Sequence, residues 1–116
     1  MFLHVEEENV LTPAPLGGDE LLGVLAALAN PIRLRILAQL AGERDYVSHL
    51  AREIGVSRPL LHMHLQRLEA VGLVVGSLEL SEDGKALRFY DVTHFDVQLT
   101  AATVAAAART LTSGDP

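Results

Sequence analysis

The sequence contains no cysteine among its 116 residues. Disulfides, thiolate catalysis, iron–sulfur clusters and cysteine zinc sites are therefore excluded, and nothing in the chain requires an oxidising compartment. Long apolar runs are also missing, because the longest, Leu21 to Ala29, is far below the roughly 20 residues that span a bilayer. The first ten residues carry an acidic cluster where a secretory signal would carry basic residues. We expect a soluble cytoplasmic protein without a membrane partner.

Basic residues are outnumbered, with 9 Lys and Arg against 15 Asp and Glu and a formal net charge of −6. Residues 1–20 contain five acidic and no basic side chains, which leaves a charge of only −1 on the remaining 96 residues. Residues 31–70 hold six arginines and four acidic residues, a net charge of +2. This distribution permits contact with a nucleic acid but does not require it.

The length suits one compact domain, and an apolar content of 49 % is enough to offset the entropy of ordering the chain. Residues 1–17 combine prolines, a glycine and an acidic triplet without a sustained period, and we expect a mobile acidic arm there. We expect the folded domain to comprise residues 18–113.

Apolar residues recur at three- and four-residue spacing in two segments that follow the arm. The first helix is expected to begin at Asp19, which can cap it. The second is expected to begin after Asn30, a good cap that is followed by Pro31, whose missing N–H is harmless in a first turn. Gly42 is expected to end this second helix.

Two further helices are expected next, over residues 47–54 and from Arg58 to about Val71. Gly55 suits the left-handed backbone just past a helix end, and Ser57 suits the cap of the following helix. A helix, a three-residue turn with glycine and another helix form the helix-turn-helix pattern.

After Gly72 the apolar period changes to two, over Val74 to Leu80 and again over Leu87 to Tyr90. Residues 81–84 supply a turn between these segments, so a β-hairpin, or wing, is expected. A last helix, built largely of alanine, is expected after Thr100. The predicted fold is mainly α with a β-hairpin, a winged helix-turn-helix of order α-α-α-α-β-β-α.

The fourth predicted helix has a polar face opposite its apolar stripe. Donors on this face can reach base edges in a major groove, and an ordinary surface helix is the alternative. The residues expected to contact DNA lie on this helix, before it and on the wing: Arg52, Ser57, Arg58, Pro59, His62, Met63, Gln66, Arg67, Lys85 and Arg88. The base readers are expected to be Arg58, His62, Met63 and Gln66, and the phosphate contacts Arg52, Arg67, Lys85 and Arg88.

The alanine-rich last helix can approach another helix closely, and its stripe exceeds what one small core covers. We expect it to form a homodimer interface with the first helix: Leu21, Leu25, Leu28, Ala101, Val104, Ala105, Ala108 and Leu111. A two-fold axis would place two recognition helices roughly 34 Å apart, so the operator is expected to be an inverted repeat. The alternative is that the last helix packs only on its own first helix.

The histidines are not spaced as metal ligands. His62 and His64 point about 200° apart on a helix and cannot chelate one ion. We expect His64 at the edge of the core and His62 in the groove. His49 and Glu53 share a helix face, where we expect a solvated pair rather than half of a metal site. Since no nucleophile elbow or glycine-rich phosphate loop occurs, we expect no enzyme. We also expect no bound metal, because of the spacing of the histidines, and no cofactor.

Three stretches of the chain resemble the ArsR/SmtB winged-helix repressors, within about residues 21–93: Leu25 to Leu37, Leu50 to Leu61 and His64 to Val74. The most specific part is the signature Ala-Asn-Pro-x-Arg-Leu-x-Ile joined to His-Leu-x-x-Leu-x-x-x-Gly-Leu-Val. The resemblance implies a homodimer paired through the first and last helices, with the fourth helix in the groove and the wing beside the phosphates. Members are commonly repressors whose ligand weakens DNA binding, so an unidentified small-molecule effector is a candidate partner.

The chain departs from the sensing sites of this family. Metal-sensing members carry Cys-Val-Cys on the third helix, where this sequence has Tyr46, Val47 and Ser48. Other members carry an Asp-x-His pair at the start of the last helix and a second pair further along it. Here Asp91 and His94 have a different spacing, and residues 97–112 contain no His, Asp or Glu. We therefore expect no transition-metal sensing, and the effector is open.

Two functions from different classes follow. The first is a dimeric, sequence-specific, DNA-binding transcriptional regulator of the repressor type. The alternative is a winged-helix module that binds protein and not DNA, which the net negative charge and the acidic wing tip, Glu82 and Asp83, favour. Salt-dependent binding to duplex DNA distinguishes them, because neutralising phosphates releases counterions.

Overall fold

The structure, a computed structural model, describes residues 15–112. Most of the predicted acidic arm, residues 1–14, lies outside the described residues, as do residues 113–116. The described chain forms two compact units, one of residues 23–94 and one of the chain ends, up to Leu22 and from Phe95.

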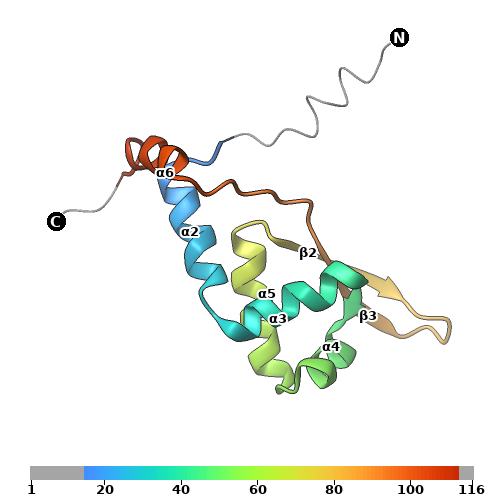
Figure 1. The fold of residues 1–116 in the computed structure, drawn as a ribbon. Coiled ribbons are helices and arrows are strands. Elements are labelled where there is room, and N and C mark those ends of the chain that lie inside the picture. Colours follow the sequence, from blue (N-terminus) through green and yellow to red (C-terminus); the bar gives the residue numbers. More distant parts are fainter. Residues whose placement is uncertain (1–14, 113–116) are drawn as a thin grey trace, which may run out of the picture. The chain divides into compact units, whose positions relative to one another are not determined.

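The order of elements is the predicted one with a single addition, the short strand β1. The elements, shown in Figure 1, are α2 (Gly18–Leu28), α3 (Pro31–Gly42), β1 (Asp45–Tyr46), α4 (Val47–Ile54), α5 (Arg58–Ala70), β2 (Val74–Leu80), β3 (Ala86–Val92) and α6 (Ala101–Ala108). Within residues 15–112 no single helix is long and apolar enough to cross a membrane, and only α2 and α3 together, bent by 92°, reach the required length.

The core of residues 23–94 is built where α3, α4 and α5 pack against one another. Each helix contributes apolar residues from one stripe, because three- and four-residue spacing returns to the same side of a helix. The largest fully buried side chains of this unit are Ile36, Leu50, Leu61, Leu65, Leu68, Leu73 and, on β3, Tyr90. Figure 1 shows the hairpin of β2 and β3 projecting from this helical group.

The predicted helix signals act as expected at the starts of α3 and α5 and at the end of α4. The Asn30 carboxamide oxygen accepts hydrogen bonds from the backbone N–H groups of Ile32 and Arg33, at 2.8 and 3.1 Å. Gly55 has a φ of 86°, in the left-handed region that glycine tolerates. Ser57 Oγ accepts from the N–H of Leu60 at 3.2 Å. The turn between α4 and α5 is therefore stabilised by the left-handed backbone of Gly55 and by the Ser57 cap, which both involve only neighbouring residues.

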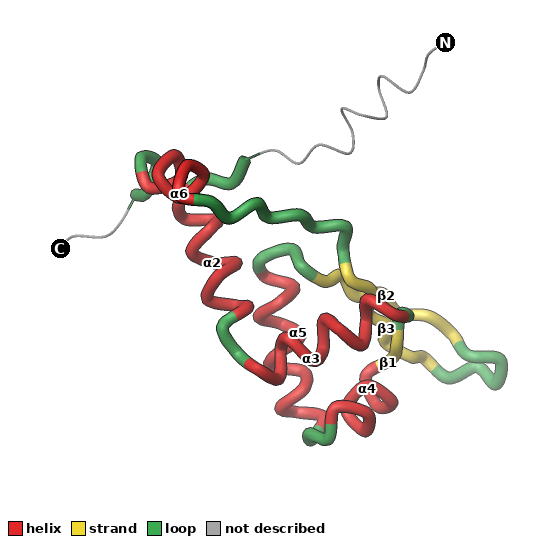
Figure 2. The backbone as a smooth tube through the Cα atoms, in the orientation of Figure 1, coloured by secondary structure: helices red, strands yellow, loops and turns green. Residues whose placement is uncertain are grey.

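The sheet contains three antiparallel strands in the order β1-β3-β2 (Figure 2). β2 and β3 pair from Val74 opposite Val92 to Leu80 opposite Ala86. β1 pairs Asp45 with Tyr90 and Tyr46 with Phe89. The sequence does not predict β1, because two residues are too few to show an alternating pattern.

Along one face of the wing the side chains change from buried near the core to exposed near the tip. Val74 and Tyr90 on this face are each 2 % exposed, whereas Leu78 and Leu80 are 64 % and 77 % exposed. Gly76 lies opposite Tyr90, and a Cβ atom at Gly76 would lie 2.9 Å from the Tyr90 ring. The ring thus packs on the backbone of β2, which only glycine permits at that distance.

The unit of the chain ends joins the start of α2 to α6. Gly18 donates its backbone N–H to Thr110 Oγ1 at 2.7 Å, and a Cβ atom at Gly18 would clash with the Ala107 carbonyl oxygen. Asp19 was predicted to cap α2, and this prediction is wrong. α2 begins at Gly18, and the Asp19 carboxylate accepts hydrogen bonds from the N–H and hydroxyl of Thr112 instead.

The cap of the last helix is confirmed. Thr100 Oγ1 accepts from the N–H of Thr103 at 3.0 Å, and Thr103 Oγ1 accepts from the N–H of Thr100 at 2.9 Å, a reciprocal capping box. The helix that follows ends at Ala108, so Leu111 lies beyond α6 and not on it.

Candidate nucleic-acid interface

The outward face of α5 is the strongest candidate site. Its outward residues are all exposed: Arg58, Pro59, His62, Met63, Gln66 and Arg67. The opposite side is buried, with Leu61, Leu65 and Leu68 at 0 % exposure and His64 at 4 %. The predicted division of this helix into a core face and a polar face is therefore confirmed.

His62 and Gln66 form a polar pair on this face. Their side chains stand one helical turn apart, and Gln66 Nε2 lies 3.3 Å from His62 Nε2. An exposed imidazole and carboxamide offer both donors and acceptors, which is the chemistry that matches base edges in a major groove.

Other candidate contacts surround the helix. Arg52 on α4 is exposed, as are Lys85 and Arg88 on the wing. Ser57 Oγ accepts from Leu60, so its hydroxyl proton is still available to donate to a phosphate. All ten predicted DNA contacts thus lie on the surface of the unit of residues 23–94.

Arg44 is exposed, but its guanidinium is engaged by neighbouring side chains of the same chain. It pairs with Glu79 across the sheet, and its guanidinium carbon lies 4.2 Å from the centre of the Phe89 ring. The hydrogen bond from Arg44 holds the pKa of the Glu79 carboxyl below its usual range. One arginine and one carboxylate of this region therefore neutralise each other.

Arg33 also lies within residues 31–70, but its side chain faces inward and is only 8 % exposed. Its Nε donates to the carbonyl of Ala27 at 2.6 Å and its Nη2 to the carbonyl of Ala26 at 3.3 Å, while Nη1 lies 3.0 Å from His64 Nδ1. The end of α2, the start of α3 and the middle of α5 are therefore connected. A sequence signal existed, because Arg33 falls on the buried stripe of α3 with Ile36 and Leu37.

His64 accepts the hydrogen bond from Arg33, since a guanidinium has only donors. Burial lowers the pKa of His64 below its usual value, and the positive charges of Arg33 and Arg67 lower it further. The imidazole is therefore neutral, with its proton on Nε2. His64 was expected at the edge of the core, and at 4 % exposure it lies within it.

A histidine between two carboxylates lies at the start of α4. His49 Nδ1 is 2.7 Å from Asp45 Oδ2, and His49 Nε2 is 3.8 Å from Glu53 Oε2. The expected pairing of His49 with Glu53 is present, and Asp45 is a further partner that the sequence prediction did not include. The two carboxylates lie near different nitrogens of the ring, and across residues 15–112 no group of three or more His, Asp or Glu side chains is arranged to hold a metal ion.

The wing tip carries negative charge. Asp83 accepts a hydrogen bond from the Ser81 hydroxyl, which lowers the pKa of the Asp83 carboxyl. Glu82 beside it is exposed. These carboxylates disfavour contact of the tip with phosphates, so Lys85 and Arg88 are the wing residues suited to it.

The predicted dimer residues differ in exposure within the single chain. On α6 the stripe Ala101, Val104, Ala105 and Ala108 is exposed, with Val104 at 44 %. Ala107 is the buried residue of α6, at 4 %, and it lies outside that stripe. Of the first-helix residues, Leu21 is buried at 8 %, and Leu25 and Leu28 are half-buried. The stripe on α6 is therefore open to a partner.

Comparison with known proteins places residues 28–76 in a helix-turn-helix domain family. The chain is 41 % identical over 69 residues to an HTH-type transcriptional regulator of Methanocaldococcus jannaschii, and the match spans 60 % of this chain and 72 % of that protein. It is 40 % identical over 53 residues to the HTH-type transcriptional repressor SmtB of Mycobacterium tuberculosis, over 46 % of this chain and 39 % of that protein.

A solved structure has the same fold. It is the homodimeric winged helix-turn-helix DNA-binding domain of a Mycobacterium bovis protein, described as a possible ArsR-family transcriptional regulator. The TM-score is 0.54 at 30 % identity, and the match covers 64 % of each chain.

Proposed function

Because this chain belongs to the ArsR/SmtB-type family of helix-turn-helix transcriptional regulators, we propose that it is a repressor that binds operator DNA as a homodimer. The observation that carries the proposal is the outward face of α5, where Arg58, His62 and Gln66 are exposed above a fully buried opposite face. A rigid helix with exposed donors and acceptors suits direct readout of base edges.

In this proposal α5 lies in the major groove. Arg58, His62, Met63 and Gln66 contact bases, and the adjacent pair of His62 and Gln66 presents its amide and ring nitrogens together. Arg52, Arg67, Lys85 and Arg88 contact phosphates and hold the helix in register. Arg33 takes no part, because it is buried and bonded to groups of the same chain, and Arg44 is paired with Glu79 on the surface.

Two chains pair through the terminal helices. The exposed stripe of α6 supports this proposal, as does the homodimeric state of the solved M. bovis domain. Small alanine side chains permit close approach of two α6 helices. A two-fold dimer reads an inverted repeat with half-sites about one DNA turn apart, roughly 34 Å.

Selection of genomic DNA fragments by the purified protein tests the function directly. We expect a small set of fragments with an inverted repeat, and an affinity whose logarithm falls linearly with the logarithm of salt concentration. Reporter expression from a selected promoter should rise when the gene for this protein is removed. Selection of random fragments at high salt, or a reporter that falls, contradicts the proposal.

A protein-binding module is the second candidate, favoured by one observation. The wing exposes Leu78 and Leu80 near the carboxylates of Glu82 and Asp83. Apolar and acidic side chains do not suit contact with phosphates. This candidate predicts no salt-dependent affinity for any duplex. The salt titration therefore separates the two functions.

A further inference from the structure

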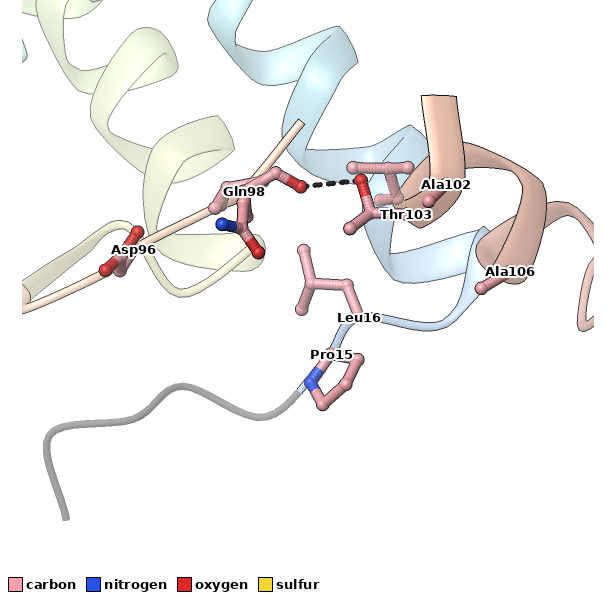
Figure 3. A pocket seen from close by; sticks show the side chains of 9 residues that line it. Pro15, Leu16, Asp96, Gln98, Ala102, Thr103 and Ala106 are labelled. Atoms are coloured by element: carbon pink, nitrogen blue, oxygen red, sulfur yellow. Dashed lines mark hydrogen bonds between the residues drawn. The ribbon is translucent and has the colours of Figure 1, made fainter. Parts of the chain in front are cut away.

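The unit of the chain ends contains a pocket of about 280 Å³. It lies among the segment before α2, α2 itself, the segment before α6, and α6 (Figure 3). Most of its lining is apolar, and the polar lining residues are Asp96, Gln98 and Thr103. This volume is close to the lower end of the roughly 300–1,000 Å³ range of small-molecule sites, which suits a ligand of about ten non-hydrogen atoms.

The pocket faces away from the proposed dimer stripe. Its α6 lining consists of Ala102, Thr103 and Ala106, whereas the stripe consists of Ala101, Val104, Ala105 and Ala108. At 100° per residue these two sets lie on nearly opposite sides of the helix. Pairing of two chains through the stripe would leave the α6 wall of the pocket in place.

The polar groups of the pocket favour a ligand that donates hydrogen bonds. Thr103 Oγ1 already donates to the Gln98 carbonyl at 2.8 Å. Among the described residues the Asp96 carboxylate has no hydrogen bond or ion pair, unlike Asp19 and Glu20 of the same unit, which bind Thr112 and the Gly17 N–H. No basic side chain is among the described lining residues of the pocket, so an anion would find no cationic partner there.

The two ends of the pocket differ in chemistry. Figure 3 shows Asp96 at one end and Ala106 at the other, with Leu16 projecting between them and the Gln98 side chain beside Leu16. A carboxylate at one end and hydrocarbon at the other match a molecule that carries a cationic head on an apolar body.

We propose that this pocket binds a small organic cation, an amine on a hydrocarbon body, with the ammonium group at Asp96 and the body against Leu16, Leu21 and Ala106. The Gln98 carboxamide, which lies between Asp96 and Leu16 in Figure 3, offers the ligand a further polar group with both donors and an acceptor. This site does not depend on the proposed DNA-binding function, because its occupancy is measured without DNA.

The test compares three probes of similar shape: 2-phenylethylamine, which is cationic at neutral pH, 2-phenylethanol, which is neutral, and phenylacetate, which is anionic. Calorimetry and amide NMR shifts on the full chain measure their binding. We expect saturable binding of the amine with shifts at the lining residues, and affinity about three- to fivefold above that of the alcohol at low salt, because Asp96 is solvent-exposed. Phenylacetate should bind most weakly.

Two variants and one control complete the experiment. Asp96→Asn should bind the amine and the alcohol equally, and Ala106→Leu should weaken both by filling the apolar end. Glu82→Gln, which removes an exposed carboxylate on the wing, should leave the preference intact. Equal affinity of the wild type for amine and alcohol, a preference that persists in Asp96→Asn, or the absence of saturable shifts at the lining would overturn the proposal. If Ala106→Leu does not fold, Asp96→Asn still decides.

Discussion

Arg33 Nη1 donates a hydrogen bond to His64 Nδ1 across 3.0 Å, and both side chains are buried. The same guanidinium binds the carbonyls of Ala26 and Ala27 near the end of α2. His64 lies on α5 between the exposed residues Met63 and Gln66, so this buried contact connects the candidate recognition helix to α3 and to the end of α2. Substitution of either partner therefore tests how firmly α5 is held.

Arg33→Met should lower the free energy of unfolding by about 2 to 4 kcal/mol, because the carbonyls of Ala26 and Ala27 and the ring of His64 lose a buried donor. Arg35→Met is the matched control, since Arg35 is exposed on the same helix and its change should stay within about 0.5 kcal/mol. Urea denaturation measures both. Equal stability of the two variants would mean that the buried contact is energetically neutral.

Acidification should destabilise the fold through His64. Its folded pKa lies below the usual histidine value of about 6.5, so the unfolded chain binds this proton first as pH falls. The contribution of His64 to stability is complete above about pH 6.5 and is lost progressively as pH falls toward the folded pKa. Denaturation at a series of pH values measures the slope. His64→Asn should remove the part of the slope in this window, and an unchanged slope would contradict the assignment.

Gly76→Ala should destabilise the wing by about 1 to 3 kcal/mol, because a Cβ atom there lies 2.9 Å from the buried Tyr90 ring. Gly42→Ala is the control, at the last residue of α3 with no atom within 4 Å of an added Cβ, and it should be neutral or stabilising by up to about 1 kcal/mol. Thermal unfolding of both variants measures the difference.

Base and phosphate contacts should respond differently to substitution. Gln66→Ala or His62→Ala should weaken operator binding by about 1 to 3 kcal/mol and leave non-specific binding unchanged. Arg52→Ala should weaken both and make the salt dependence shallower. Titrations with operator and random duplex at several salt concentrations measure these effects. Unaltered operator affinity in all three variants would show that α5 is not the recognition helix.

Ala108→Glu should produce monomers with much weaker operator binding, because it places an unpaired charge in the proposed α6 interface. Ala41→Glu, at an exposed position on α3, controls for the added charge and should stay dimeric. Sedimentation measures the oligomeric state. A dimeric Ala108→Glu protein with normal operator affinity would show that the exposed stripe of α6 is not the interface.

The sequence by itself determined the features that depend on neighbouring residues. Asn30, Gly55, Ser57 and Thr100 each act within four residues of their own position, by capping a helix start or by adopting a left-handed backbone. The two faces of α5 follow in the same way from helical spacing, and this spacing alone is enough to select the candidate DNA-binding residues on the helix.

Contacts between distant residues were decided only by the tertiary structure. β1 exists because Asp45 and Tyr46 pair with residues more than 40 positions later in the chain. From its residue type alone Arg33 would be expected on the surface. It is buried because two carbonyl oxygens of α2 and a ring nitrogen of α5 accept hydrogen bonds from its guanidinium. Asp19 suits a helix cap by residue type, but Thr112 offers it two donors once α6 has packed near the start of α2. A charged or polar side chain takes the best partners that folding brings within reach, and local spacing does not specify those partners.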